Sequence, residues 1–324
     1  MTTSDKILQY IAKNGQASGK DITEYLKDIS SRAVRKQLKN LLDKDILTKV
    51  GRPPKVYYLL ATKKEKPTTV FVDSAIGRII NDRYLFISPT GQAKSGWEGF
   101  MAWCEKTKQD PIKTAYEYIQ TLKKYDHFRK ENVIDGMKKM QQTFGQVYLD
   151  KLFYLDFYSI ERFGKTKLGQ MLLYAKQSQN KDLIRELIDE IRPRVTAIII
   201  KFKIDGVLFI PPTVRREIQF MRELENRLQL PIRKVSVGKV KTDIIVPQKT
   251  LTKLDDRIEN AQHTIIVDDK EFYNNILFLD DAVGSGATMN ETAKQIKKKE
   301  LCQGKIIGLA ITGSFKGFDV ISEV

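Results

Sequence analysis

The first 60 residues carry three helical patterns of apolar positions followed by a strand pattern. In the first pattern, Ile7, Leu8 and Ile11 share one helical face, with Ser4 as the predicted N-cap and Gly15 after the last turn. The expected elements are helices over residues 4–15, 19–28 and 30–47, the third with Val34, Leu38, Leu41 and Leu42 on one face, and two strands within 47–60. The strands are expected on both sides of residues 51–54 because two prolines there exclude a helix.

Three helices followed by a hairpin is the element order of a winged helix-turn-helix domain, which we expect over residues 1–62. Residues 61–69 are short, charged and contain a proline, as expected of a linker. Further helical patterns follow, for instance over 110–125. We therefore expect residues 63–150 to form a linker and a helical connector or dimerisation element.

The pattern changes at about residue 151, where apolar runs begin to alternate with helical segments. The expected order is helices within 166–191, an apolar run over 196–210 that ends at two prolines, a helix before 230, strands at 263–269 and 274–281, a helix at 287–299 and a strand at 305–314. Strands that alternate with helices predict a parallel α/β sheet. The fold class is therefore α/β, with a Rossmann-like domain over residues 151–324.

Composition adds a preference for an anionic partner and excludes some site chemistries. The chain has 324 residues, 41% of them hydrophobic, and a net charge of +16, which favours nucleic acid or a phosphorylated ligand over a merely soluble basic protein. Two cysteines, Cys104 and Cys302, provide too few ligands for a zinc ribbon and fit a reducing cytoplasm. No apolar run approaches the ~20 residues of a membrane-spanning helix, so no membrane partner is expected.

Half of the net charge lies in the N-terminal segment. Residues 1–66 hold fifteen Lys or Arg and seven Asp or Glu, a balance of 15 − 7 = +8. The candidate contacts to double-stranded DNA are Ser31, Arg32, Arg35, Lys36 and Lys39 on the third helix and Arg52 and Lys55 on the hairpin. Winged helices also bind proteins or dimerise, and a homodimer is the expected assembly because two-fold pairing raises affinity for DNA.

The segment 274–298 holds the most specific chemistry. Ile276–Leu279 is a continuous apolar run, as expected of a strand buried on both faces, and Asp280 and Asp281 follow it. The next residues, Gly284, Ser285, Gly286, Ala287 and Thr288, combine backbone freedom, two hydroxyls and the start of a helix. Such a loop can bind a phosphate through backbone N–H groups, while the two acids accept hydrogen bonds from sugar hydroxyls. Dinucleotide and P-loop glycine patterns do not fit, but a plain strand–turn–helix would.

The run from Leu279 to Thr288 resembles the motif by which type I phosphoribosyltransferases bind phosphoribosyl pyrophosphate (PRPP), with Ser285 where that motif has Thr. The resemblance implies that Asp280 and Asp281, the candidate catalytic pair, hold the ribose hydroxyls and that residues 284–288 bind the 5′-phosphate. It also implies Mg²⁺ that arrives with PRPP, and no metal held directly by the protein.

A second resemblance is to ComF-like phosphoribosyltransferase domains, whose signature is similar to Gln248, Leu251, Arg257 and Asn260, with one more residue than usual between Gln and Arg. It implies positive charge for a diphosphate from Arg215 and Arg216, and a basic lid from Lys239 and Lys241. A solvated helix start and an exposed basic hairpin are the competing interpretations. Lys176 lies in the segment 157–177, which resembles the Tyr-to-Lys segment of the same family and makes this lysine a further candidate. The four-cysteine zinc ribbon of many ComF-like proteins is absent.

Two classes of function follow. The first is a DNA-binding regulator whose phosphoribosyltransferase-type domain senses PRPP or a nucleotide, similar in logic to purine-operon repressors. The second is an active, Mg²⁺-dependent phosphoribosyltransferase that moves phosphoribosyl from PRPP to a base. A ComF-like accessory role in DNA uptake or processing is a further alternative, supported by fold analogy alone.

Overall fold

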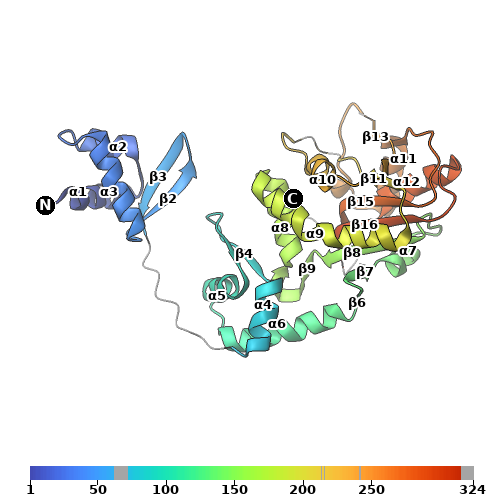
Figure 1. Ribbon diagram of the computed structural model, residues 1–324, viewed down its shortest axis with the longest axis horizontal. Coiled ribbons are helices and arrows are strands. Elements are labelled where there is room, and N and C mark those ends of the chain that lie inside the picture. Colours follow the sequence, from blue (N-terminus) through green and yellow to red (C-terminus); the bar gives the residue numbers. More distant parts are fainter. Residues whose placement is uncertain (62–71, 213, 215, 241, 315–324) are drawn as a thin grey trace. The chain divides into compact units, whose positions relative to one another are not determined.

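The computed structural model describes residues 1–61, 72–212, 214, 216–240 and 242–314, without the side chains of Arg52 and Lys249. Its contacts divide the chain into two compact units, Met1–Val70 and Phe71–Val324. Figure 1 labels the helices and strands of both. Two predicted site residues, Arg215 and Lys241, lie outside the described residues.

The first unit has the element order expected from its pattern. It contains α1 (Thr3–Asn14), β1 (Ala17–Ser18), α2 (Gly19–Tyr25), α3 (Ser31–Asp43), β2 (Leu47–Arg52) and β3 (Lys55–Leu60), with the strands in the antiparallel order β1-β3-β2. The core packs the apolar faces of all three helices against the start of β2. The predicted cap at Ser4 is wrong: Thr2 is the N-cap of α1, and the Ser4 hydroxyl donates instead to Gln37 Oε1 on α3 at 3.0 Å.

A glycine allows the tight hairpin between β2 and β3. Gly51 has φ +85°, and a Cβ there would lie 2.3 Å from the carbonyl oxygen of Lys55. Any side chain would therefore strain the turn and push the two strands apart. The hairpin keeps its register to the end, where Arg52 pairs with Lys55.

The second unit is mixed α/β and is built on a seven-stranded sheet with the order β12-β11-β15-β16-β8-β7-β6. The strands are β12 (Arg233–Lys234), β11 (Gly206–Phe209), β15 (Ile276–Val283), β16 (Ile306–Gly313), β8 (Lys151–Phe157), β7 (Val133–Asp135) and β6 (Arg129–Lys130). The strands from β12 to β8 are parallel, whereas β7 and β6 are antiparallel to their neighbours. The expected parallel sheet is thus confirmed for its central part.

Helices cover both faces of this sheet (Figure 1). One face packs against α8 (Lys167–Ser178), α9 (Lys181–Phe202) and α10 (Phe220–Leu228). The other packs against α12 (Ala287–Lys298) and against α4 (Ser74–Arg83), α5 (Gly96–Thr107), α6 (Pro111–Asp126) and α7 (Met137–Thr143), with α11 (Leu254–Thr264) beside α12. Two-sided cover explains why the central strands read as continuous apolar runs.

Three short antiparallel strand pairs complete the unit. Two are hairpins, β4 (Leu85–Ile87) with β5 (Ala93–Ser95) and β9 (Ser159–Ile160) with β10 (Gly164–Lys165). The third joins β13 (Val237–Lys239) to β14 (Ile265–Val267) across the segment that contains α11. The strand expected at 263–269 is therefore present, but it pairs outside the main sheet.

The segment expected as a connector packs within the same unit as the sheet. Its strands β6 and β7 extend the sheet beyond β8, and aromatic side chains of α4–α6 join the core of one sheet face. No boundary at residue 150 separates the described residues on its two sides, because long-range pairing, which local periodicity does not encode, joins them.

Candidate functional site

The candidate site begins where β15 reaches the carboxyl edge of the sheet. Ile276 to Leu279 are all buried, as expected, between β11 and β16. The strand does not end at the acids: it continues to Val283, with Asp280 and Asp281 inside its last four residues. Both carboxylates are therefore held by a strand that is paired with β16 on one side as far as residue 283.

The loop that follows turns sharply at one glycine. Gly286 has φ +84° and is the N-cap of α12, and its carbonyl accepts the N–H of Asn290 at 2.9 Å. The hydroxyl of the buried Ser285 accepts the N–H of Ala287 at 3.3 Å. Other N–H groups of the first turn have no partner inside the helix, as at any helix start. The arrangement is suited to an anion, and the helix dipole favours the same charge.

Two lysines from distant elements meet the acid pair. Lys176 Nζ of α8 lies 2.7 Å from Asp281 Oδ2, and the N–H of Asp281 donates to Asp280 Oδ1 at 2.8 Å. Burial and the Asp281 carboxylate raise the pKa of Asp280 well above its usual range, against the pull of Lys176 and Lys239. Burial lowers the pKa of Lys239 on β13, and Asp280 partly offsets this. Lys176 and Lys239 therefore both belong to the site's electrostatics.

The loop after β11 reaches the end of α8, close to the same lysine. The guanidinium of Arg216 donates to the carbonyl oxygen of Lys176, and the N–H of Ile218 donates to Gln179 Oε1 at 2.7 Å. Arg216 thus binds the negative end of the helix that carries Lys176. The sequence also allowed Arg216 to lie at a solvated helix start. In the structure its side chain instead binds the end of α8.

The four residues that resemble the ComF-type signature form one local hydrogen-bond network. Gln248 Nε2 donates to the carbonyl of Arg257 at 2.9 Å and to Asn260 Oδ1 at 3.0 Å, while Arg257 Nε donates to the carbonyl of Leu251 at 2.8 Å. Asn260 Nδ2 reaches the carbonyl of Val246 at 3.4 Å. These bonds attach residues 246–251 to α11, so in this structure the four residues stabilise the loop that precedes the helix.

On the first unit, the predicted DNA contacts of α3 share one exposed face. The exposed residues are Ser31, Arg32, Arg35, Lys36 and Lys39, and Lys55 on the hairpin is exposed as well. Ser31 is the first residue of α3, which fits a helix that presents its N-terminal end. The side chain of Arg52 is outside the described atoms.

Two buried polar groups were not predicted from the sequence, and one of them lies at this site. The Thr312 hydroxyl is buried and without a hydrogen-bond partner among the described residues, and Thr312 pairs in register with Ala282, next to Asp281. The Lys139 Nζ on α7 is likewise buried and without a hydrogen-bond partner among the described residues. Neither residue stands in a motif, so only the three-dimensional arrangement could reveal them.

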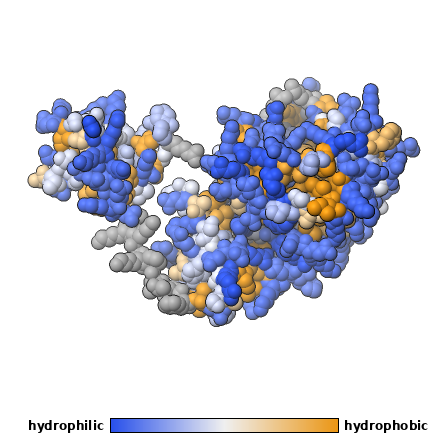
Figure 2. Space-filling view, viewed as in Figure 1, coloured by the Kyte–Doolittle hydropathy of each residue, from blue (hydrophilic) through white to orange (hydrophobic). Residues whose placement is uncertain are grey.

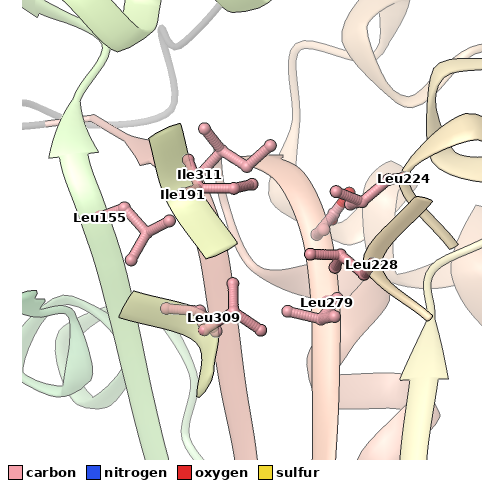
Figure 3. Close-up of a pocket in the computed structure, with 9 residues that line it drawn as sticks. Leu155, Ile191, Leu224, Leu228, Leu279, Leu309 and Ile311 are labelled. Carbon is pink, nitrogen blue, oxygen red and sulfur yellow. The ribbon is translucent and has the colours of Figure 1, made fainter. Parts of the chain in front are cut away.

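The interior beneath the site leaves no room for a ligand. Apolar side chains from β8, β15, β16, α9 and α10 converge there (Figure 3), around a void of about 10 Å³ that Asp280 also lines. That volume is at most the size of one water molecule. A ligand would have to bind at the outer edge of the sheet, above the carboxyl ends of the strands.

The described residues contain no group of three or more His, Cys, Asp or Glu side chains placed to hold a metal ion. None of the helices in the described ranges is both long and apolar enough to cross a membrane. On the face in view, both units are mostly hydrophilic, and hydrophobic residues gather over part of the second unit (Figure 2).

Comparison with protein-family models gives no match, and neither does comparison with curated proteins.

Proposed function

We propose that the chain is a DNA-binding regulator whose second unit binds PRPP or a related ribose phosphate. The observation that carries the proposal is the end of β15: two carboxylates, a turn at Gly286 in a left-handed conformation, and the start of α12, all within nine residues. A phosphate at the turn and ribose hydroxyls at the acids would use both halves of this arrangement. The ligand would then be a phosphorylated pentose.

The lysines beside the acids fit the same ligand. Lys176 already neutralises Asp281, so a ligand that carries several negative charges meets less repulsion than two unpaired carboxylates would cause. Lys239 is the last residue of β13, which pairs with β14. In this proposal Lys239 meets the diphosphate, while Asp280 accepts a ribose hydroxyl.

Mg²⁺ would enter with the ligand. Two adjacent carboxylates flanked by lysines are too few donors for a dedicated cage, but they suit an ion held mainly by diphosphate oxygens and water. The ion would neutralise the diphosphate. The protein's own part is to orient the ribose at Asp280 and Asp281 and the 5′-phosphate at the turn.

The first unit supplies the proposed DNA contact. Five residues of α3 with exposed side chains share a surface that bears four positive charges, and the helix begins at Ser31, directly after its N-cap Ser30. Contacts of this kind to phosphates give affinity that falls steeply with salt. We expect Lys39→Ala to lower the salt dependence of DNA affinity by about one unit of slope, whereas Lys13→Ala, an equal loss of charge on α1, should not.

A direct test of the ligand site is calorimetric titration of PRPP with and without Mg²⁺. We expect Asp281→Asn to weaken binding about tenfold or more, since a charge-assisted contact is lost, and Asp256→Asn, on the exposed side of α11, to leave it unchanged. If wild-type protein does not bind any ribose phosphate, the proposal fails.

An active phosphoribosyltransferase is the second candidate, because the acid pair has two lysines beside it that can stabilise a departing diphosphate. Release of pyrophosphate from PRPP, assayed over a panel of bases, separates the two functions. Binding without turnover supports the regulator, and turnover supports the enzyme.

A further inference from the structure

The outer side of α9 exposes an apolar stretch. The opposite side of this helix is buried in the second unit through residues such as Leu187, Ile191 and Val195. On the outer side, at helical spacing, the exposed residues are Asp189, Pro193, Thr196, Ala197, Ile200 and Lys203. Ile200 is 71% exposed, so most of its apolar surface is in contact with water, and covering that surface would be favourable.

These six residues are arranged symmetrically along the helix. The small residues 196–197 lie in the middle, Pro193 and Ile200 lie about one turn to either side, and Asp189 and Lys203 lie at the two ends. Two copies of α9 that pack antiparallel about a two-fold axis at the middle would place each Ile200 against Pro193 of the other copy. The same axis brings each Lys203 to Asp189 of the other copy.

The charges at the two ends favour this antiparallel arrangement. Lys203 makes no ion pair among the described residues, and Asp189 has a surface pairing of 3.7 Å to Arg192 on the same helix, a kind of contact that contributes little. Each end can therefore accept a charge from a second copy. A parallel pair would instead place like charges together at both ends, which is unfavourable.

We propose that the second unit forms a two-fold dimer through the outer side of α9, with a second copy of this chain as the partner. The inference does not depend on the ribose phosphate site. The dimer joins two first units in one particle, and two DNA-binding units can engage a two-fold symmetric duplex site together.

The test is sedimentation equilibrium of the full chain over a range of concentrations. We expect the wild type to dimerise reversibly and Ile200→Glu to raise the dissociation constant about tenfold or more, because each copy would bury an unpaired carboxylate near the axis. The substitution should not unfold the protein, since Ile200 is exposed. Ile244→Glu, the same change at an isoleucine that is 78% exposed outside α9, should leave dimerisation unchanged.

A charge exchange tests the antiparallel pairing itself. Lys203→Asp should weaken the dimer, because the new carboxylate faces Asp189 of the other copy, and adding Asp189→Lys should restore it. A wild type that stays monomeric would overturn the proposal. A dimer that Ile200→Glu leaves intact would also overturn it, and would assign the contact to another surface, such as the first unit. Failure of the double variant to recover would overturn the antiparallel arrangement.

Discussion

Asp280 lies where burial and a neighbouring carboxylate both oppose its ionisation. Its native pKa is raised, so the native state holds the proton more tightly than the unfolded state does. The stability from this group is therefore complete below the unfolded pKa, near 4, and is lost as pH rises through the native pKa. A residue that lowers the stability of the fold at neutral pH in this way is typical of a residue retained for binding.

This sign predicts the stability of an Asp280→Asn variant. The amide is neutral at every pH, so the variant should be more stable than the wild type at pH 7.5, by on the order of 1 kcal/mol. The difference should shrink as pH falls and approach zero below the unfolded pKa, near 4, where Asp280 is protonated in both states. Thermal unfolding at several pH values measures it, with Asp256→Asn as the control. A constant difference across this range would contradict the raised pKa.

Gly286 permits a second test at the residue scale. An alanine there would adopt φ near +84° at a cost of about 1–2 kcal/mol and would also meet the sulfur of Met140. We expect Gly286→Ala to destabilise the second unit and to weaken ribose phosphate binding. Gly145→Ala is the matched control, because nothing lies within 4 Å of a Cβ at that position. Adding Met140→Ala should relieve the steric part and leave the backbone strain. Equal stability of the two glycine variants would count against this account.

At the scale of elements, the sequence predicts best what is encoded locally. The run 276–279, the turn glycines and the helix after them follow from neighbouring residues, and α12 begins at Ala287 as expected. The apolar run 196–210 does not by itself separate helix from strand: residues 196–202 form the end of α9, and only Gly206–Phe209 is strand. The pairing of β7 with β8 and the approach of Lys176 to Asp281 depend on contacts distant in sequence, which no local pattern contains.

One buried side chain joins such distant elements. Asn290 of α12 accepts the N–H of Tyr148 at 2.8 Å and donates to the carbonyl of Gln146 at 3.0 Å. The segment before β8 is thereby tied to the helix that carries the candidate phosphate turn. Both partners are backbone groups, which would lose their bonds if the amide were removed.

We therefore expect Asn290→Ala to lower the free energy of unfolding of the second unit by about 2 kcal/mol. Denaturant unfolding followed by tryptophan fluorescence reports on this unit alone, because both tryptophans, Trp97 and Trp103, lie in it. Lys298→Ala, at the exposed end of the same helix, serves as the control. An unchanged midpoint would mean that the two hydrogen bonds contribute no net stability.

At the scale of the whole molecule, the proposed regulator needs a free energy of coupling between its two units. If PRPP changes the affinity for DNA by a given factor, DNA must change the affinity for PRPP by the same factor, because both describe one thermodynamic cycle. Typical coupling is about 1–3 kcal/mol, or roughly 5- to 150-fold. The relation holds for binding whether or not the second unit is also an enzyme.

This reciprocity gives the last prediction. DNA affinity is measured by anisotropy at several PRPP concentrations, and PRPP affinity by calorimetry with and without a duplex, at one salt concentration because both depend on salt. We expect the two factors to agree and to differ from one. Asp281→Asn should shift the effect of PRPP on DNA binding to about tenfold or more higher PRPP concentrations without weakening DNA binding itself, since the substitution lies outside the first unit. Two independent affinities, each unaffected by the other ligand, would leave a protein that binds both but regulates through neither, and the enzymatic candidate would then be preferred.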